Sequence, residues 1–282
     1  MKSYSTEKIR NLALVGHSAS GKTSVCEALL YKTGNLKRLG KVEDGNTVTD
    51  FDKEEISRGV SISTAIAPVE WRDFKINLID TPGYFDFSGE VYSSLRASEA
   101  ALVVLDAQNG IEVGAEKVLK YTENIELPRI IFVNKMDKEN VNFAKVVSDL
   151  HIAFGKKVIP FTLALGEGEN FKGIIDVLNK KAYEYDGFER KEVEIPEIRV
   201  EEVNHVYDTI VEVVAETDDE LMEKYFEGEE FTDEEIKKGL VKGISEGVIV
   251  PVCSSAFELG HGVAGLLDVL LTYVPTPLQH GA

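Results

Sequence analysis

The chain has 282 residues, of which 43% are hydrophobic, and a formal net charge of −18. This length suits one large domain or one domain with an insertion, and the apolar content is typical of a globular protein. The absence of any run of about 18 apolar residues, or of an apolar signal near the start, argues against a membrane-spanning or secreted class and favours a cytoplasmic protein. Cys26 and Cys253 lie far apart without metal or redox spacing, so we expect two buried thiols.

The first part of the chain alternates between strands and helices. A strand is expected over 9–16, followed by a helix that reaches Tyr31 and stops by Gly34. Two further strands, 64–70 and 75–80, flank the turn WRDF. Continuous apolar runs at 101–106, 129–134 and 248–253 are typical of buried parallel strands, and helices are expected near 86–98, 112–124, 139–153 and 263–273. This alternation predicts an α/β fold with a mostly parallel, doubly wound sheet.

The alternation breaks down between residues 158 and 247. The strand-like pieces VIPFTLAL and KAYEY are followed by two expected helices, near 201–226 and 232–245. We therefore predict a small α+β subdomain over 158–247, inserted into a main domain made of residues 1–157 and 248–276. Residues 277–282 are typical of the start of a linker.

The predicted insertion carries most of the negative charge. It contains 25 acidic and 10 basic side chains, a net −15, which leaves −3 for the rest of the chain. Such a segment repels nucleic acid and can attract a basic partner. We expect no sequence-specific nucleic-acid binding, while a well-solvated acidic surface without a partner is the alternative explanation.

Residues 16–23 read GHSASGKT and match the pattern G-x-x-x-x-G-K-[ST]. Gly16 and Gly21 allow the tight turn that points amide groups inward, and the helix that follows completes an anion site. Lys22 supplies a charge for the outer phosphates and Thr23 a hydroxyl for Mg²⁺. An ordinary glycine-rich turn is the alternative. The pattern predicts a P-loop fold in which phosphate is bound by Gly16, His17, Ser18, Ala19, Ser20, Gly21, Lys22, Thr23 and Ser24.

A second group of candidate residues surrounds the end of the strand at 75–80. Asp80 ends this strand, where P-loop enzymes hold the water shell of the metal, and Gly83 offers an amide where a γ-phosphate would lie. Ser61, in the run RGVSI that is expected to begin the pairing strand, would complete the Mg²⁺ shell. The polar loop over 35–60 is then a candidate order–disorder switch. The alternatives are a capping or turn aspartate at 80 and a plain surface loop at 35–60.

The run NKMD, residues 134–137, predicts which base is bound. Asp137 can accept hydrogen bonds from N1–H and the 2-amino group of guanine, whereas adenine would leave this carboxylate unpaired. Lys135 can lie over the base plane, and Asn134 can brace the loops. The Ser255–Ala256 pair can offer a backbone amide to guanine O6. The predicted guanine site comprises Asn134, Lys135, Asp137, Ser254, Ser255 and Ala256.

These segments resemble translational GTPases, specifically elongation factor G and the bacterial elongation factor G-like proteins. The likeness covers essentially all 282 residues. VEDGNTVTDFDKEEISRGVSI and DTPGYFDFSGEV are similar to the two switches of the family, PRIIFVNKMD to its base-reading strand, ELMEKYFEGEEFTDEEIKKGL to its extra subdomain, and CSSAFELGHGVAGLLDVLLTYVPTP to the end of the domain.

The resemblance implies a P-loop GTPase domain that binds GTP or GDP with Mg²⁺ and hydrolyses GTP in a ribosome-linked cycle. It also implies a monomer that forms the N-terminal part of a protein with four further domains. Its partner would be the factor-binding site of the large ribosomal subunit, with a stalk protein on the acidic insertion. By the same resemblance, Thr23, Ser61 and Asp80 hold the metal, and the catalytic set is Lys22, Gly83 and Tyr84.

Four positions differ from the family pattern. Ser61 stands where the family usually has threonine, and Gly16 where elongation factor G often has alanine. Ala19 replaces an aspartate, which puts any monovalent-cation contact of that carboxylate in doubt. Tyr84 replaces the histidine that orients the attacking water.

The tyrosine leaves two hypotheses open. A phenol with a reference pKa near 10 is a poor base at pH 7, but it can donate and accept a hydrogen bond. The chain is either a working GTPase, in which Tyr84 or the ribosome positions water, or a GTP-gated ribosome-binding module with little or no hydrolysis. A third class, an ATP-using P-loop enzyme, leaves NKMD and the serine–alanine pair unexplained. Translocation, ribosome recycling and ribosome protection all stay open.

The five histidines, at positions 17, 151, 205, 261 and 280, are scattered without ligand spacing. We therefore expect neither a zinc site nor a further catalytic residue among them. His17 is expected to face solvent.

Overall fold

The computed structural model describes residues 2–279. The expected linker over 277–282 is therefore described only to Gln279, and His280 lies outside the described residues. The strands are β1 (Ile9–Val15), β2 (Ala65–Trp71), β3 (Phe74–Asp80), β4 (Ala100–Asp106), β5 (Arg129–Asn134), β6 (Val158–Pro160), β7 (Thr162–Leu165), β8 (Gly173–Asp176), β9 (Lys181–Asp186), β10 (Glu189–Val193) and β11 (Val250–Ser254). The helices are α1 (Lys22–Lys32), α2 (Lys53–Arg58), α3 (Ser88–Arg96), α4 (Val113–Asn124), α5 (Phe143–Phe154), α6 (Glu197–Ala215), α7 (Asp219–Phe226), α8 (Asp233–Ser245) and α9 (Val263–Tyr273).

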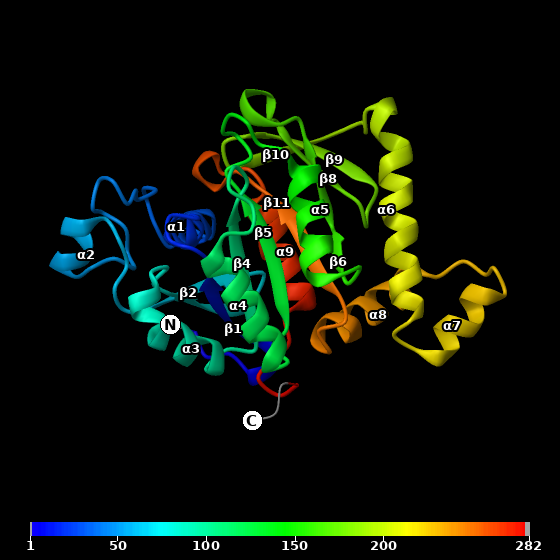
Figure 1. The fold of residues 1–282 in the computed structure, drawn as a ribbon, viewed down its shortest axis with the longest axis horizontal. Helices are drawn as coiled ribbons and strands as arrows, with labels where there is room; N and C mark the ends of the chain where they lie inside the picture. The colour runs from blue at the N-terminus through cyan, green and yellow to red at the C-terminus, as the bar shows by residue number, and fades with distance from the viewer. Residues whose placement is uncertain (1, 280–282) are drawn as a thin grey trace.

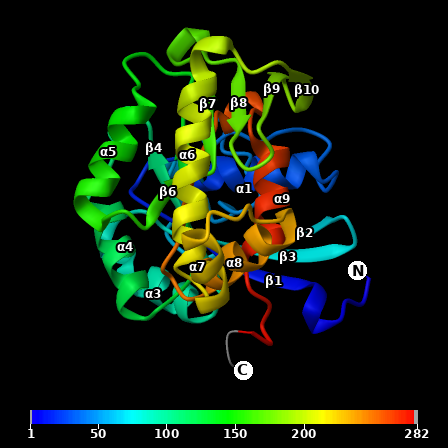
Figure 2. The same ribbon diagram turned by 90° about the vertical axis from the view of Figure 1, so that its right-hand side faces the viewer.

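The main sheet has seven strands in the order β2-β3-β1-β4-β5-β11-β6, shown in Figure 1. The pairs β1–β3, β1–β4, β4–β5, β5–β11 and β11–β6 are parallel, and only the edge strand β2 is antiparallel to its neighbour. Helices α3, α4 and α5 lie on one side of this sheet and α1 and α9 on the other, as the turned view shows (Figure 2). The predicted doubly wound α/β fold is confirmed.

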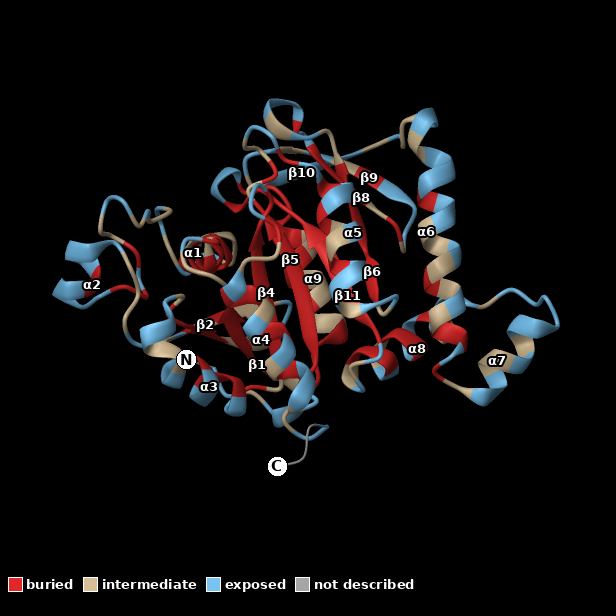
Figure 3. Cartoon of the chain, in the orientation of Figure 1, coloured by how far each residue is buried: buried red, intermediate tan, exposed pale blue. Residues whose placement is uncertain are grey.

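Burial explains why the central strands read as continuous apolar runs. Every residue of β4, β5 and β11 is buried, because helices cover both faces of a parallel sheet. Figure 3 shows this core in the main sheet, whereas α2, α6 and α7 are largely exposed. Both cysteines are buried free thiols, as predicted. Among the described helices, none is long and apolar enough to cross a membrane.

The segment predicted as an insertion forms a second, antiparallel sheet in the order β10-β9-β8-β7, followed by α6, α7 and α8. The run VIPFTLAL is divided between the two sheets. Its first part, β6, pairs with β11 of the main sheet, and its second part, β7, pairs with β8. Residues 158–160, predicted as the start of the insertion, therefore pair with the main sheet. The division into two domains stays a prediction.

Two predicted elements differ from the structure. The single helix expected over 201–226 is broken into α6 and α7, because Asp218 takes an extended conformation and its side chain accepts a hydrogen bond from the Glu220 amide. The run RGVSI does not begin a strand. Arg58 ends α2, Gly59 follows with a φ of +63°, and β2 starts only at Ala65. The predicted switch loop over 35–60 thus contains a short helix.

Candidate active site

The phosphate-binding loop follows β1 at the carboxyl edge of the main sheet, directly before α1. Gly16 and Gly21 have φ values of +148° and +99°, in the region that favours glycine. A Cβ at Gly16 would lie 2.4 Å from the Val104 carbonyl oxygen, and one at Gly21 would lie 2.4 Å from Asn134 Nδ2. Both predicted glycines are therefore required by the backbone and by the close approach of neighbouring strands.

Lys22 is buried at the centre of this loop. Its ammonium group donates to the carbonyl oxygens of Gly16 and His17 at 3.3 and 2.9 Å. Burial lowers the pKa of Lys22 to about 8, while the charges of Asp80 and Asp50 oppose this shift. A buried cation with only carbonyl acceptors is ready to bind an anion that enters the loop.

The predicted metal ligands meet in one cluster of oxygen atoms. Thr23 Oγ1 donates to Asp80 Oδ2 at 2.9 Å and lies 3.3 Å from Ser61 Oγ. The other carboxylate oxygen of Asp80, Oδ1, is buried and has no hydrogen-bond partner among the described residues. Hydroxyl and carboxylate oxygens are the ligands that Mg²⁺ prefers, so these residues fit such an ion.

Two residues of this cluster were missed by the sequence analysis. Thr49 Oγ1 donates to Asp80 Oδ2 at 2.7 Å, and Asp50 accepts a 2.6 Å hydrogen bond from Ser61. Both lie in the loop between α1 and α2 and are buried. In the sequence, only their position in the candidate switch loop pointed to a role near the metal, since threonine and aspartate are common in surface loops.

The predicted base-reading residues follow β5 at the same edge. Asn134 donates to the Ser20 carbonyl at 3.2 Å and accepts from the Phe257 amide at 3.2 Å, so it connects the phosphate loop with the loop after β11. Lys135 donates to the Ala19 carbonyl and to Asp106, both at 2.8 Å. Asp137 is mostly buried, and its nearest cation is Lys138 at 3.4 Å. Its side chain is 18% exposed, so the carboxylate is partly accessible.

The serine–alanine segment after β11 lies beside NKMD. The Met136 amide donates to the Ser255 carbonyl at 3.0 Å, which holds the two loops together. The Ser255 amide donates to the Val133 carbonyl at 2.8 Å, whereas the Ala256 amide makes a longer 3.3 Å bond to His261. Of the two predicted donors, Ala256 is thus the more available. The Ser254 hydroxyl lies 3.2 Å from Thr162 Oγ1 of β7, facing the insertion and away from the phosphate loop.

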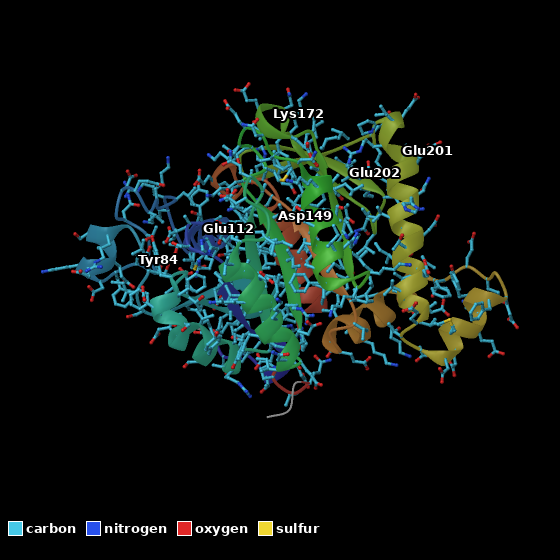
Figure 4. The ribbon with its side chains drawn as sticks, viewed as in Figure 1. Tyr84, Glu112, Asp149, Lys172, Glu201 and Glu202 are labelled. Atoms are coloured by element: carbon cyan, nitrogen blue, oxygen red, sulfur yellow. The ribbon has the colours of Figure 1, made fainter. Side chains whose placement is uncertain are left out.

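A cavity of about 390 Å³ connects the phosphate loop with the switch residues. Tyr84 lines it, and 47% of this residue is exposed. Figure 4 shows Tyr84 on the side of the molecule that carries α2. Gly83 packs against the loop, since a Cβ there would lie 2.6 Å from Lys22 Nζ. The lining from the predicted phosphate site comprises Ser18, Ala19, Gly21, Lys22, Thr23 and Ser24, with Ser61, Gly83, Tyr84 and Lys135 from the other segments.

Two side chains of the phosphate loop point away from this cavity. His17 Nε2 lies 3.5 Å from Glu112, which Figure 4 labels near the start of α4, and His17 Nδ1 is buried. A Cβ at Gly114 would lie 2.6 Å from that nitrogen. His17 is therefore only partly exposed, with 28% of its side chain accessible, because α4 packs against one edge of its ring. Ser20 is buried, so its hydroxyl is not free to contact phosphate.

In a comparison with known protein families, residues 7–276 match the elongation factor Tu GTP binding domain. The chain belongs to this family of GTP-binding domains. The resemblance to translational GTPases and the P-loop GTPase fold are thereby confirmed, together with guanine-nucleotide binding as the property of the family. The cavity at the carboxyl edge of the main sheet is the candidate site of this GTPase domain. Lys135 is the residue of the predicted guanine site that lines it, whereas Asn134, Asp137 and residues 254–256 do not, so the guanine site stays a prediction.

A solved structure extends the comparison of this GTPase domain. A crystal structure of a protein from Thermus thermophilus matches it with a TM-score of 0.92 and 39% sequence identity, over 97% of this chain and 41% of the Thermus chain. The domain therefore spans less than half the length of that relative. The match includes the antiparallel sheet and helices of the insertion, because it covers nearly the whole chain.

The buried Asp80 predicts a pH-dependent stability of this GTPase domain. Burial raises the pKa of Asp80 to about 6, although hydrogen bonds from Thr49 and Thr23 and the charge of Lys22 oppose the shift. The folded protein then holds a proton that the unfolded chain releases above about pH 4, so the stabilisation from the neutral carboxyl is lost as the pH rises through 6. Asp80→Asn, which copies the neutral form, should raise the free energy of unfolding at pH 7.5 by about 3 kcal/mol.

Thermal melts with EDTA and without nucleotide measure this effect. The gain of Asp80→Asn over the natural protein should fall to below about 1 kcal/mol at pH 4, where the folded carboxyl is neutral and the unfolded one is only about half ionised. A variant that is less stable than the natural protein at pH 7.5 would show that the hydroxyl and lysine contacts of the charged carboxylate outweigh its burial.

Proposed function

We propose that this chain is the nucleotide-switch domain of a cytoplasmic translation factor of the elongation factor G type, which binds GTP with Mg²⁺ and hydrolyses it in a ribosome-linked cycle. One observation carries the proposal. The phosphate loop, Asp80, NKMD and the serine–alanine pair end at the same sheet edge, with Tyr84 and the switch residues lining the cavity between them. Ligands of open α/β sheets bind at this edge.

In this proposal the phosphate loop and the switch hold the triphosphate. Amides of Ala19 to Lys22 and the ammonium of Lys22 bind its oxygens, and the Gly83 amide approaches the γ-phosphate. Thr23, Ser61 and a water on Asp80 would hold Mg²⁺, which neutralises charge on the phosphates when it is bound. The unpartnered Asp80 Oδ1 and the neighbouring hydroxyls support this assignment.

The base-reading residues give the selectivity for guanine. Asp137 accepts from N1–H and the 2-amino group, and the Ala256 amide donates to O6. Lys135 is held in place by Asp106 and the Ala19 carbonyl, so its stem is positioned beside the loop that binds phosphate. These contacts reject adenine because it offers no donor to the carboxylate.

The partner in this proposal is the factor-binding site of the large ribosomal subunit, with the acidic insertion facing a basic ribosomal protein of the stalk. The charge of residues 158–247 supports a basic partner. We propose a monomer that forms the N-terminal part of a longer protein, in line with its coverage of 41% of the Thermus chain.

In this proposal, Tyr84 is the residue that decides whether the domain hydrolyses GTP. Phosphoryl transfer depends on positioning and charge stabilisation more than on a strong base, so a phenol at the cavity can hold the attacking water. Its hydroxyl makes no hydrogen bond within the described residues and is free for this role. The same exposure also suits the second candidate, a GTP-gated ribosome-binding module with little hydrolysis.

Single-turnover release of γ-phosphate from GTP, measured with the full-length protein, separates the two candidates. We expect intact ribosomes to accelerate release. Tyr84→Phe should then slow the ribosome-stimulated rate by about five- to ten-fold, because it removes one hydrogen bond of about 1 kcal/mol to the attacking water.

Tyr84→His is the matched variant and should retain or increase that rate, since imidazole can also bind water. Phosphate release that ribosomes do not stimulate would favour the binding module over the enzyme. An unchanged rate in Tyr84→Phe would show that water is positioned by other groups.

A further inference from the structure

The loop after β11 is held by aromatic side chains of the insertion. His261 stacks on Tyr185 of β9, with ring centroids 5.4 Å apart and an interplanar angle of 22°. The ring of Phe171, which precedes β8, also contacts the His261 ring, and their centroids are 5.8 Å apart. Phe188 lies under Gly260, where a Cβ would come within 2.6 Å of its ring. Three insertion residues therefore fix the far side of this loop.

The main chain carries this anchorage to the base-reading amide. The His261 amide donates to the Ala256 carbonyl at 3.1 Å, and the Ala256 amide donates to the His261 carbonyl at 3.3 Å. This pair forms an isolated antiparallel bridge that closes the loop. Gly262 packs next to it, since a Cβ there would lie 3.1 Å from the Ser255 side chain. The direction of the Ala256 N–H thus depends on where His261 lies.

Stacking, rather than hydrogen bonding, holds the His261 ring. The residue is 8% exposed, and its Nδ1 is buried without a hydrogen-bond partner among residues 2–279. Burial lowers the pKa of His261, against the charges of Asp137 and Asp186, so the ring is neutral at pH 7. A neutral ring in contact with two aromatic side chains is a packing element, and an apolar ring of similar size can replace it.

We infer that His261 is a positioning residue for guanine recognition. Its contacts with Tyr185 and Phe171 make the insertion part of the structure that positions the Ala256 amide to donate to guanine O6. The inference rests on the proposed function, in which the Ala256 amide donates to O6. On this inference, the insertion helps to shape the nucleotide site, in addition to any contact that its acidic surface makes with a partner. Removing the stack of His261 on Tyr185 should weaken the hydrogen bond to guanine O6 and leave recognition of the 2-amino group by Asp137 unchanged.

Three nucleotides separate these effects in equilibrium binding to the full-length protein. GDP and 6-thio-GDP differ only in the atom at position 6, because sulfur is the weaker acceptor, while IDP lacks only the 2-amino group that Asp137 reads. We expect the natural protein to prefer GDP over 6-thio-GDP by about five- to ten-fold, the effect of one hydrogen bond. His261→Ala should bring this ratio to within about two-fold of unity and leave the GDP-to-IDP ratio unchanged.

Two further variants test the stack itself. His261→Phe should restore the GDP-to-6-thio-GDP ratio, because the ring uses no hydrogen bond in the fold. Tyr185→Leu removes the same stack from the side of the insertion and should lower the GDP-to-6-thio-GDP ratio as His261→Ala does. It tests the inference if His261→Ala does not fold. Tyr207→Leu on α6, which removes a ring that Lys180 covers, is the matched control and should change neither ratio.

The outcomes distinguish the inference from the function on which it rests. If the natural protein binds GDP no more tightly than ADP, the proposed function fails. If guanine selectivity is present but both ratios fall together, or neither changes in His261→Ala and Tyr185→Leu, the positioning role is overturned.

Discussion

Asp137→Asn should lower the affinity for GDP by about 10³-fold and make xanthosine diphosphate the preferred ligand. The carboxylate is predicted to accept two donors of guanine, and an amide in its place brings its own NH₂ group against the 2-amino group. Xanthine carries an oxygen at that position, to which the Asn amide can donate. Competition binding of GDP and xanthosine diphosphate measures both changes.

The fold should tolerate this substitution. The only ion pair of Asp137 within the described chain is the 3.4 Å contact with Lys138, whose side chain is 41% exposed, so its loss should affect stability little. Asp149→Asn on α5, labelled in Figure 4 well away from Tyr84, makes the same chemical change outside the predicted guanine site and should leave both affinities unchanged. Retention of tight GDP binding by Asp137→Asn would contradict the assignment of the guanine site.

Lys22→Met should separate binding from stability. Removing the buried ammonium takes away the cation that faces the phosphates, and we expect GDP affinity to fall by about 10²- to 10³-fold, as for loss of one partner of a buried charge pair. Because burial lowers the pKa of Lys22 to about 8, its charge is costly in the fold without an anion. The variant should therefore be no less stable than the natural protein when nucleotide is absent.

Isothermal titration with GDP and thermal melts without nucleotide test the two halves of this prediction. Lys145→Met on the exposed face of α5 is the matched control. A variant that binds GDP normally would remove Lys22 from the phosphate site. A variant that melts well below the natural protein at pH 7.5 would show that the bonds to the Gly16 and His17 carbonyls stabilise the fold more than the buried charge destabilises it.

Local sequence was sufficient to predict the elements that follow from one hydrophobicity pattern or from one steric requirement of the backbone. The continuous apolar strands β4, β5 and β11 could be predicted because burial on both faces leaves no polar positions. The phosphate loop could be predicted because Gly16 and Gly21 meet a backbone demand that other residues do not meet. The base-reading run could be predicted because it ends a strand of this kind.

Long-range packing decided the features that the sequence analysis missed. Asp218 divides a continuous helical pattern by capping α7, and the run after α5 changes sheets between β6 and β7. Thr49 and Asp50 join the Asp80 cluster across the switch loop. His17, expected to face solvent, is partly packed against α4. Apart from the cap at Asp218, these contacts join segments that are distant in the sequence, so no local pattern reports them.

The sequence by itself predicted the α/β class, the order of the nucleotide motifs and guanine as the expected base, since each depends on residue type and spacing. Only the tertiary structure decided which hydroxyls reach Asp80, which strand closes the main sheet and what holds the loop of Ala256. The physical reason is that the aromatic stack of His261 on Tyr185 joins segments far apart in the chain, and its position exists only after both sheets have formed.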